Sequence, residues 1–415
     1  MTLDDLKANV DFEKFIVDLG YTLDKKRSTR QHRIYEKNGD KVCLKQGDKY
    51  VVYFSIHGPD SGTIIDFCKA RESEVLANCQ GNNSLEKAYN RLMNFIGRQN
   101  EIKISTQRMI PGETKKDFSL TDDAFVIPKS KDINSRDFSY LKRRCISGSV
   151  LGSPVFSNTG LSKNDYGFYN LAFPLFNTED EIKGVVYRYY NPTSKEHKKI
   201  FLKGSDKLNA ISLSTLDYKN ASEIIICESD IDCMSHYQLF KNQQKDLLYI
   251  ACEGYLTKGQ TSNILSHVSS IKEYRKEHKA SLPTITMAFD NDENGQAYTT
   301  AILFSLLENE AISVSPDSIE RADGTKMAFS FSISLDKIKN DYSELLENVP
   351  GIRIGLIDNN FKITIPRDMQ SLSQANKALL SISKNVGIDR SMGKDFNEDL
   401  QVESKKKDRS VGKSI

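Results

Sequence analysis

The chain has 415 residues, contains no tryptophan and lacks any apolar run long enough to cross a membrane. Its longer apolar stretches, such as Ile224–Ile226, are far shorter than the roughly 20 residues of a membrane helix. The first residues, Met1–Asp5, carry acids where a secretion signal needs a basic start followed by an apolar run. We therefore expect a cytoplasmic protein that makes no membrane contact.

Cysteine pairs with the spacing Cys-x-x-Cys are also missing. The seven cysteines lie at positions 43, 68, 79, 145, 227, 233 and 252. An odd number without metal-site spacing fits reduced thiols in a cytoplasm better than a disulfide framework. The sequence therefore predicts neither disulfides nor a cysteine-based zinc site.

An excess of charge of one sign is absent too, because 58 Lys and Arg balance 56 Asp and Glu to a net charge of +2. This balance excludes a chain that nucleic acid coats along its whole length, so any such contact must come from local basic clusters. The length allows two to four domains.

Apolar periodicity and turn signals divide the chain into several parts. A helix at Phe12–Gly20 and three strand-like runs, separated by Asn38-Gly39 and Gly47-Asp48, indicate a small β module with helices. Further on, strand-like runs at 223–227, 247–251 and 284–289 alternate with helical stretches. This alternation predicts a parallel sheet, whose ligand site lies at the carboxyl ends of the strands.

The expected fold class is α/β. We expect a small β domain at 1–96, a linker at 97–116, an α+β subdomain at 117–216, an α/β domain at 217–403 with a βαββα insert at about 324–390, and a disordered basic tail at 404–415.

Two strands of the expected parallel sheet end in acids. The first delivers Glu228 and then Asp232, and the second delivers Asp290 and Asp292. Carboxylates gathered at one sheet edge supply the oxygen ligands that Mg²⁺ prefers, and without a metal they would raise one another's pKa. A calcium loop is excluded, because Ala301 stands at the twelfth position, where such a loop needs Glu. A solvent-facing turn would explain one of these acids, but not both strand ends together.

The motif Glu228-x-x-x-Asp232, followed by Asp290-x-Asp292-x-x-Gly295, resembles the Toprim domain shared by topoisomerases, bacterial-type primases and certain nucleases. The loop around Glu253-Gly254 and the segment Gly393–Leu400 are similar to later parts of that domain, whereas Ser229 stands where the family has glycine. The resemblance implies that Glu228, Asp290 and Asp292 are catalytic and bind Mg²⁺ or Mn²⁺. Asp232 and Asp395 would be supporting acids.

The segment Tyr140–Ile146, with Cys145 in place of a glycine, resembles the Tyr-Leu-x-x-Arg-Gly-Ile segment of bacterial replicative primases. The resemblance continues through Asn170–Leu175 and implies that four basic residues hold template or triphosphate: Arg144, Arg188, Lys199 and Lys203. A solvated hairpin face is the alternative for these residues.

The first hundred residues resemble the zinc ribbon of such primases, and Gly62–Phe67 matches its closing segment. Ser55 and Gly58, however, stand where two zinc cysteines belong, and His32 and His57 alone do not make a four-ligand site. We therefore expect a ribbon fold without zinc. Its candidate DNA contacts are Lys25, Lys26, Arg27, Arg30 and Arg33.

As a whole, the resemblance implies a primase-like Toprim protein of the kind carried by plasmids and other mobile elements. Its reaction would be metal-dependent nucleotidyl transfer on single-stranded DNA with nucleoside triphosphates, with a helicase or relaxase as a candidate partner. Two alternatives stay open: a Toprim nuclease that nicks DNA with the same acids, and a non-catalytic DNA-binding accessory protein.

Overall fold

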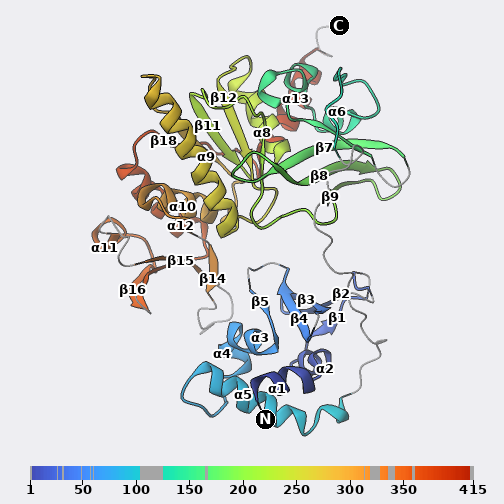
Figure 1. The fold of residues 1–415 in the computed structure, drawn as a ribbon, viewed down its shortest axis with the longest axis vertical. Coiled ribbons are helices and arrows are strands. Elements are labelled where there is room, and N and C mark those ends of the chain that lie inside the picture. The colour runs from blue at the N-terminus through green and yellow to red at the C-terminus, as the bar shows by residue number, and fades with distance from the viewer. Residues whose placement is uncertain are drawn as a thin grey trace. The chain divides into compact units, whose positions relative to one another are not determined.

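The fold was analysed in a computed structural model, which describes residues 2–25, 27–29, 32–47, 49–56, 58, 60–102, 125–163, 167–312, 314–317, 328–334, 342–357 and 360–411. The chain forms two compact units: residues 1–114 with 315–328, and residues 115–314 with 329–415 (Figure 1). No helix among the described residues is long and apolar enough to span a membrane.

The first unit is an antiparallel sheet packed by helices. Its strands follow one another in sequence order: β1 (Thr22–Leu23), β2 (His32–Lys37), β3 (Asp40–Gln46), β4 (Val51–Ser55) and β5 (Ser61–Gly62). Its helices are α1 (Leu3–Asn9), α2 (Phe12–Asp18), α3 (Ile64–Ala70), α4 (Glu72–Val75) and α5 (Ser84–Ile96), followed by a 3₁₀ turn at Gln99–Glu101. The expected β module is thus confirmed.

Local sequence explains these elements. Asp11 caps α2 by accepting a hydrogen bond from the backbone N–H of Lys14. Asn38 and Gly39 both adopt a positive φ, which is the conformation that a tight hairpin turn between β2 and β3 requires. Aromatic side chains from helices and strands, including Phe67 and Tyr53, meet edge to face in the core. Of the expected linker, residues 103–116 lie outside the described residues.

The second unit is built on one mixed sheet of nine strands in the order β18-β13-β11-β12-β10-β7-β8-β9, with β6 paired to β7. Its strands are β6 (Gly160–Lys163), β7 (Tyr169–Phe176), β8 (Ile182–Asn191), β9 (Glu196–Phe201), β10 (Ile211–Leu213), β11 (Glu223–Cys227), β12 (Leu247–Ala251), β13 (Thr284–Ala288) and β18 (Val386–Ile388). The strands β18, β13, β11 and β12 are parallel to one another. Strand β10 pairs antiparallel with β12 on one side and with β7 on the other, and so connects the parallel strands to the antiparallel ones. The α/β fold class is confirmed, with a sheet that continues from its parallel part into antiparallel strands.

Helices cover both faces of this sheet (Figure 1). They are α6 (Ser139–Arg143), α7 (Gly148–Leu151), α8 (Asp230–His236), α9 (Lys258–Glu277), α10 (Glu293–Glu308) and α13 (Phe396–Val411), with a 3₁₀ turn at Pro154–Phe156 and a π-helical turn at Tyr237–Lys241. Alternate residues of β11 point to opposite faces: Ile224 and Ile226 join the core that contains α9 and α10, whereas Ile225 and Cys227 join the one that contains α8 and α13. Because β11 is buried on both sides, it reads as a continuous apolar run.

Strand β14 (Ser315–Asp317) follows α10. The range expected for the insert then contains β15 (Ala328–Ser334), α11 (Tyr342–Leu345), β16 (Arg353–Ile357), β17 (Asn360–Pro366) and α12 (Met369–Ile382), which is the expected βαββα order. Strands β15, β17 and β16 are neighbours in a separate sheet. Strand β18 falls within the range expected for the insert, but it pairs with β13 in the main sheet.

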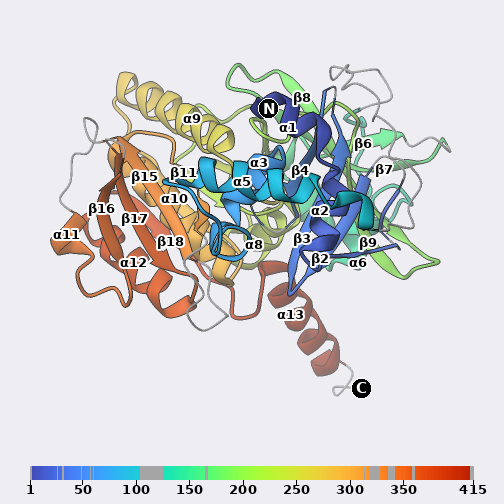
Figure 2. The ribbon, with the colours of Figure 1, turned by 90° about the horizontal axis from the view of Figure 1, so that it is seen from below.

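The expectation of a disordered tail is wrong for residues 404–411, because α13 continues to Val411. Asp395 accepts a hydrogen bond from the backbone N–H of Glu398 at the start of this helix. Phe396 and Leu400 anchor its first turns in the core, and Lys405 and Lys406 lie toward its carboxyl end, where the helix dipole favours positive charge. In Figure 2 the helix extends away from the rest of its unit.

Candidate functional site

Each of the four parallel strands is followed by a carboxylate. Glu228 follows β11, Glu253 follows β12, Asp290 follows β13 and Asp389 follows β18. The strands β12, β11 and β13 end side by side, because Cys227 at the end of β11 is paired with Ala251 on one side and with Ala288 on the other. The acids therefore gather at the carboxyl edge of the sheet, where ligands of parallel sheets bind.

The structure brings together all five acids that the sequence singles out. The charge of Asp290 interacts with those of Asp232, Glu228, Asp395 and Asp292, and that of Glu228 interacts with Asp232 and Asp292. We call Glu228, Asp232, Asp290, Asp292 and Asp395 the acid cluster.

Burial and mutual repulsion raise the pKa of three members of the acid cluster. Burial is the largest cause for Glu228 and Asp290, and the neighbouring carboxylates add to it, so that the pKa of Glu228 rises to about 7 and that of Asp290 to about 9. The pKa of Asp232 rises to about 6, mainly through burial and despite the hydrogen bond from Ser229. pKa shifts of this size are typical of functional sites at which a positively charged group binds beside the carboxylates.

Two members of the acid cluster also cap helices, and a third is bonded to a capping residue. Asp292 accepts a hydrogen bond from the Gly295 N–H at 2.9 Å, at the start of α10, and Asp395 does the same for α13. At α8 the capping residue is Ser229, whose hydroxyl accepts from the Asp232 N–H at 3.3 Å and donates to the Asp232 carboxylate at 2.5 Å. Three helix N-termini thus begin at the acid cluster, and their dipoles reduce the cost of placing anions there.

Glu228 and Asp290 have no such role. Within the described part of the chain, neither side chain accepts a hydrogen bond, and Oδ1 of the buried Asp290 has no partner at all. A buried polar atom without a partner costs free energy, and native proteins leave few of them. An external positive group would remove this cost.

The donor set fits a hard divalent cation, since every member is a carboxylate and two members are unpartnered. As the side chains stand, no group of three or more His, Cys, Asp or Glu among the described residues is arranged to hold a metal ion. Glu228, Asp290 and Asp292 are the residues that would hold it, because they lie at the ends of two adjacent strands and a second oxygen of Asp292 is not used in capping.

Gly295 explains why the second acidic motif contains a glycine. A Cβ atom at this position would lie 2.0 Å from the backbone oxygen of Asp290. Only glycine therefore lets the first turn of α10 approach the end of β13 this closely. The motif is thus a packing requirement as well as a source of carboxylates.

The basic residues expected at this site occupy different environments. The guanidinium of Arg188 is 11% exposed and donates to Glu253 at 2.7 Å. Lys199 donates from Nζ to the backbone oxygen of Glu253 at 2.9 Å, and its charge lowers the pKa of Glu228. Arg144 has a buried Nε without a partner and its charge lowers the pKa of Asp232. Lys203 is exposed after β9. The charges of Arg144 and Arg188 thus act on Asp232 and that of Lys199 acts on Glu228, and Arg188 is in addition paired to Glu253.

Glu253 was missed as a functional residue by sequence reasoning. Its side chain is 1% exposed and its φ of +58° is unusual for a non-glycine residue. The carboxylate also accepts from the Asp230 N–H at 2.9 Å, in the first turn of α8. Burial alone would raise the pKa of Glu253, but Arg188 and Lys199 outweigh burial and hold that pKa at about 2. Its position after an apolar strand was the available signal.

The candidate DNA contacts of the first unit are only partly exposed. Lys25 and Arg27 are exposed, but Arg33 is buried, with its Nε 3.7 Å from the Glu13 carboxylate. Because Arg33 is already beside an acid inside the unit, the expectation that it contacts DNA is wrong. Lys26, Arg30 and His57 lie outside the described residues.

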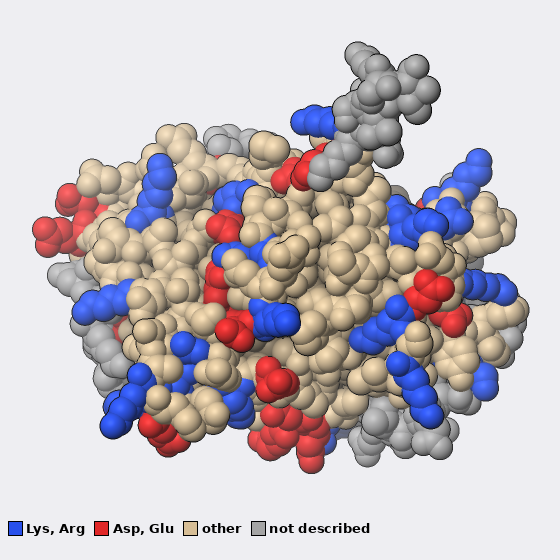
Figure 3. All heavy atoms as spheres, turned by 90° about the horizontal axis from the view of Figure 1, so that it is seen from above, with Lys and Arg blue, Asp and Glu red and all other residues tan. Residues whose placement is uncertain are grey.

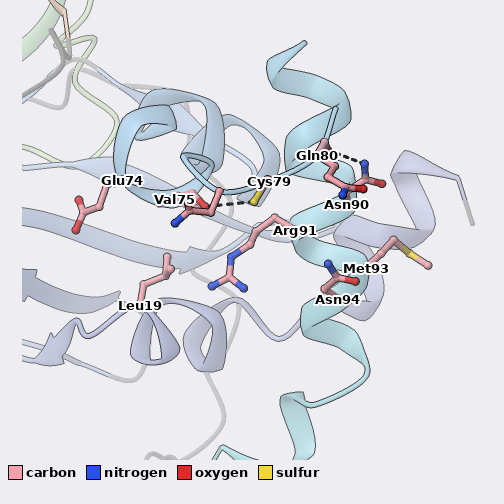
Figure 4. Close-up of a pocket in the computed structure, with 10 residues that line it drawn as sticks. Leu19, Glu74, Val75, Cys79, Gln80, Asn90, Arg91, Met93 and Asn94 are labelled. Atoms are coloured by element: carbon pink, nitrogen blue, oxygen red, sulfur yellow. Dashed lines mark hydrogen bonds between the residues drawn. The ribbon is translucent and has the colours of Figure 1, made fainter. Parts of the chain in front are cut away.

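A hollow of about 750 Å³ lies in the first unit between α2, α4 and α5 (Figure 4). Amide side chains line much of it, and one of them, Asn90, donates to the backbone oxygen of Gln80 at 2.8 Å. None of the site residues expected from the sequence lines this hollow.

The surface of the molecule agrees with its balanced charge. On the face drawn in Figure 3, lysine and arginine side chains are interspersed with acidic ones. Neither sign of charge dominates this face.

Comparison with known families supports this location. Residues 225–323 match the family model described as Toprim-like. The match covers a minority of the chain and includes β11, β12 and β13 with four of the five members of the acid cluster. No curated protein matches the chain.

Several solved structures show a weak likeness. The Aquifex aeolicus primase structure, with zinc-binding and RNA polymerase domains, is 14% identical over 78% of this chain and 81% of that chain, with a TM-score of 0.28. The RNA polymerase domain of Mycobacterium tuberculosis primase DnaG is 14% identical over 45% of this chain and 71% of that one, with a TM-score of 0.29. A chain from a bacteriophage T7 lagging-strand DNA polymerase complex with gp4 primase domains is 19% identical over 38% and 68%, with a TM-score of 0.25.

Proposed function

We propose that the chain is a primase-like, metal-dependent nucleotidyltransferase that acts on single-stranded DNA with nucleoside triphosphates. The observation that carries the proposal is the acid cluster, four of whose five members lie inside the Toprim-like segment. Oδ1 of the buried Asp290 has no hydrogen-bond partner among the described residues. Glu228, Asp290 and Asp292 would bind Mg²⁺ or Mn²⁺. Asp395 would support them by capping α13, and Asp232 would support them through its bond with Ser229, the capping residue of α8.

When bound, a divalent cation would neutralise the charge that develops on a transferring phosphoryl group. The protein's own residues supply the rest. Lys199 and Arg144, whose charges act on members of the acid cluster, would bind phosphate oxygens. Glu228 is the residue that we propose accepts a proton from the attacking hydroxyl.

For Arg188 we propose a structural role in place of the expected contact with template or triphosphate. Its bond to Glu253 leaves it little exposed, so we assign it to holding β8 against the end of β12. Exposed Lys203 keeps its proposed role as a contact for template or triphosphate.

The wider setting rests on the sequence resemblance. On that basis we propose that the first unit derives from a zinc ribbon without zinc, and that the protein serves a plasmid or other mobile element in the cytoplasm, with a helicase or relaxase as partner.

The experiment is incubation with single-stranded DNA, labelled nucleoside triphosphates and Mg²⁺ or Mn²⁺, resolved on a denaturing gel. We expect new short oligomers that disappear in Asp290→Asn. Shortened input strands would instead indicate the Toprim nuclease. Unchanged input without new products would indicate a non-catalytic DNA-binding protein and contradict the proposal.

A further inference from the structure

The segment between β18 and α13 contains Met392, whose side chain is the most exposed large hydrophobic side chain among the described residues. Met392 is 89% exposed, although its neighbours Ser391 and Phe396 are buried. We call residues Ser391–Lys394 the Met392 loop. An apolar side chain in water at a fixed place is a common feature of binding surfaces.

The Met392 loop is held firmly by α13. The backbone N–H groups of Met392 and Gly393 each donate to a different oxygen of Asp399 at 2.7 Å. The Lys394 N–H donates to the Glu398 carboxylate, also at 2.7 Å. Three successive backbone donors are thus bonded to acids of a single helix, and the exposure of Met392 is built into the loop.

The Met392 loop is also attached to the acid cluster. Asn291, which lies between Asp290 and Asp292 in the sequence, donates from its backbone N–H to the Lys394 oxygen at 2.7 Å. Its side-chain amide donates to the Ser391 oxygen at 3.2 Å. The loop therefore has a fixed position beside the second acidic strand end.

Lys394 adds a positive charge at this place. Its side chain is exposed and its charge lowers the pKa of Glu228, as does that of Lys199. The two lysines come from different elements, the loop before α13 and strand β9. An anionic ligand at the acid cluster would therefore meet positive charge from both elements.

We propose that the Met392 loop is a contact site for single-stranded nucleic acid, in which Lys394 binds a backbone phosphate and Met392 packs against an unstacked base. Thioether groups make favourable contacts with aromatic rings, and single-stranded nucleic acid offers a base face beside every phosphate. This site deepens the proposed function, since it names how the strand is held beside the acid cluster.

The test measures equilibrium binding of two labelled oligomers of equal length, a thymidine oligonucleotide and an abasic deoxyribose-phosphate strand. No nucleoside triphosphate is present, and a gel verifies that the oligomers stay intact. We expect Met392→Ala to weaken binding of the thymidine strand by roughly two- to ten-fold and to leave binding of the abasic strand unchanged. Lys394→Gln should weaken both and lower the salt slope by about 0.7.

Matched controls come from α12 of the same unit. Met369, which is 38% exposed, and Lys377, which is exposed, are replaced as Met369→Ala and Lys377→Gln, and neither change should alter binding. The proposal is overturned if the thymidine strand does not bind the wild type, if the loop variants bind as the wild type does, or if Met392→Ala weakens both strands equally.

Binding and synthesis can fail separately. If Met392→Ala and Lys394→Gln bind like the wild type while Asp290→Asn still abolishes primer synthesis, the loop proposal is wrong and the proposed function stands. If no synthesis occurs but the loop variants lose binding as expected, the loop contacts nucleic acid in a protein without that activity.

Discussion

Glu253 determines how the basic residues of the site are arranged. Its carboxylate bonds to Arg188 of β8 and to the backbone of α8, and its backbone oxygen bonds to Lys199 of β9. One residue thus connects the antiparallel strands with the helix that carries Asp232. An ion pair of this kind positions its members more than it stabilises the fold, because desolvation offsets much of the attraction.

Removal of the Glu253 charge should be costly, because it leaves Arg188 buried without a counter-charge. We expect Glu253→Gln to lower the free energy of unfolding by about 3 kcal/mol, measured by urea denaturation at pH 7. Glu181, whose ion pair with Lys183 at 2.7 Å is exposed, provides the control, and Glu181→Gln should cause no measurable change. Equal stability of Glu253→Gln and the wild type would mean that the pair does not hold β8.

At the residue scale, the sequence was sufficient to locate the acids at the strand ends, but it did not show which groups the basic residues bind. Glu228 and Asp290 could be predicted because an apolar strand that ends in an acid is visible in the sequence. The partner of Arg188 could not, since Glu253 is 65 residues away and only the fold brings them together. Nothing in the sequence near Arg188 shows that its side chain turns inward.

Among the elements, the contact between β13 and α10 is the tightest near the site. A Cβ atom on Gly295 would overlap the backbone of Asp290, so Gly295→Ala must displace the helix or the strand end. We expect a loss of roughly 1–3 kcal/mol in the free energy of unfolding, together with weaker Mg²⁺ binding measured by calorimetry.

Gly355 in β16 is the matched control, because a Cβ atom there meets nothing within 4 Å. Gly355→Ala should leave both quantities unchanged. If Gly295→Ala binds Mg²⁺ like the wild type, the close packing of α10 does not position the acid cluster.

In the first unit, the buried side chain of Arg71 forms an ion-pair network that links several elements. Arg71 donates to Asp40 at 2.7 Å and to Asp60 at 2.8 Å, and its guanidinium lies 4.3 Å from the centre of the Phe67 ring. These contacts tie the hairpin, the loop before β5 and α3 together. Protein groups alone can therefore link the elements that a metal would link in a ribbon with zinc.

Accordingly, we expect the purified protein to contain no stoichiometric zinc by elemental analysis. A chelator should leave its far-ultraviolet circular dichroism and melting temperature unchanged. One tightly bound zinc per chain, or unfolding with the chelator, would refute the alignment that places Ser55 and Gly58 at ligand positions.

The strands predicted at 223–227, 247–251 and 284–289 agree with β11, β12 and β13 within a residue, because their apolar patterns are local. It did not predict that β10 would pair antiparallel with both β12 and β7 and so join two expected domains in one sheet. No strand was predicted at 386–388, where β18 lies, because three residues carry too little pattern. The end of α13 was missed since its charged residues resemble a solvated tail.

For the molecule as a whole, the acid cluster couples stability to pH. The pKa values of Glu228, Asp290 and Asp232 are raised, chiefly by burial, to about 7, 9 and 6. The folded state therefore keeps protons that the unfolded state has lost, and stability falls as pH rises from about 4 to about 9. We expect the melting temperature without divalent metal to decrease over this range, and the increase caused by Mg²⁺ to grow. A melting temperature that rises from pH 5 to pH 8 without metal would contradict the raised pKa values.

The most direct test of the metal-dependent site compares wild type and Asp290→Asn for melting temperature, with and without Mg²⁺, and for primer synthesis. The substitution keeps the shape of the side chain and removes its charge. We expect Mg²⁺ to stabilise the wild type and not the variant, and activity to fall by several orders of magnitude, since a bound metal contributes several kcal/mol to transition-state stabilisation. If the acids only repel one another, the variant melts at a higher temperature and keeps full function. Equal activity and an equal response to Mg²⁺ in both proteins would contradict the assignment of Asp290 as a metal ligand.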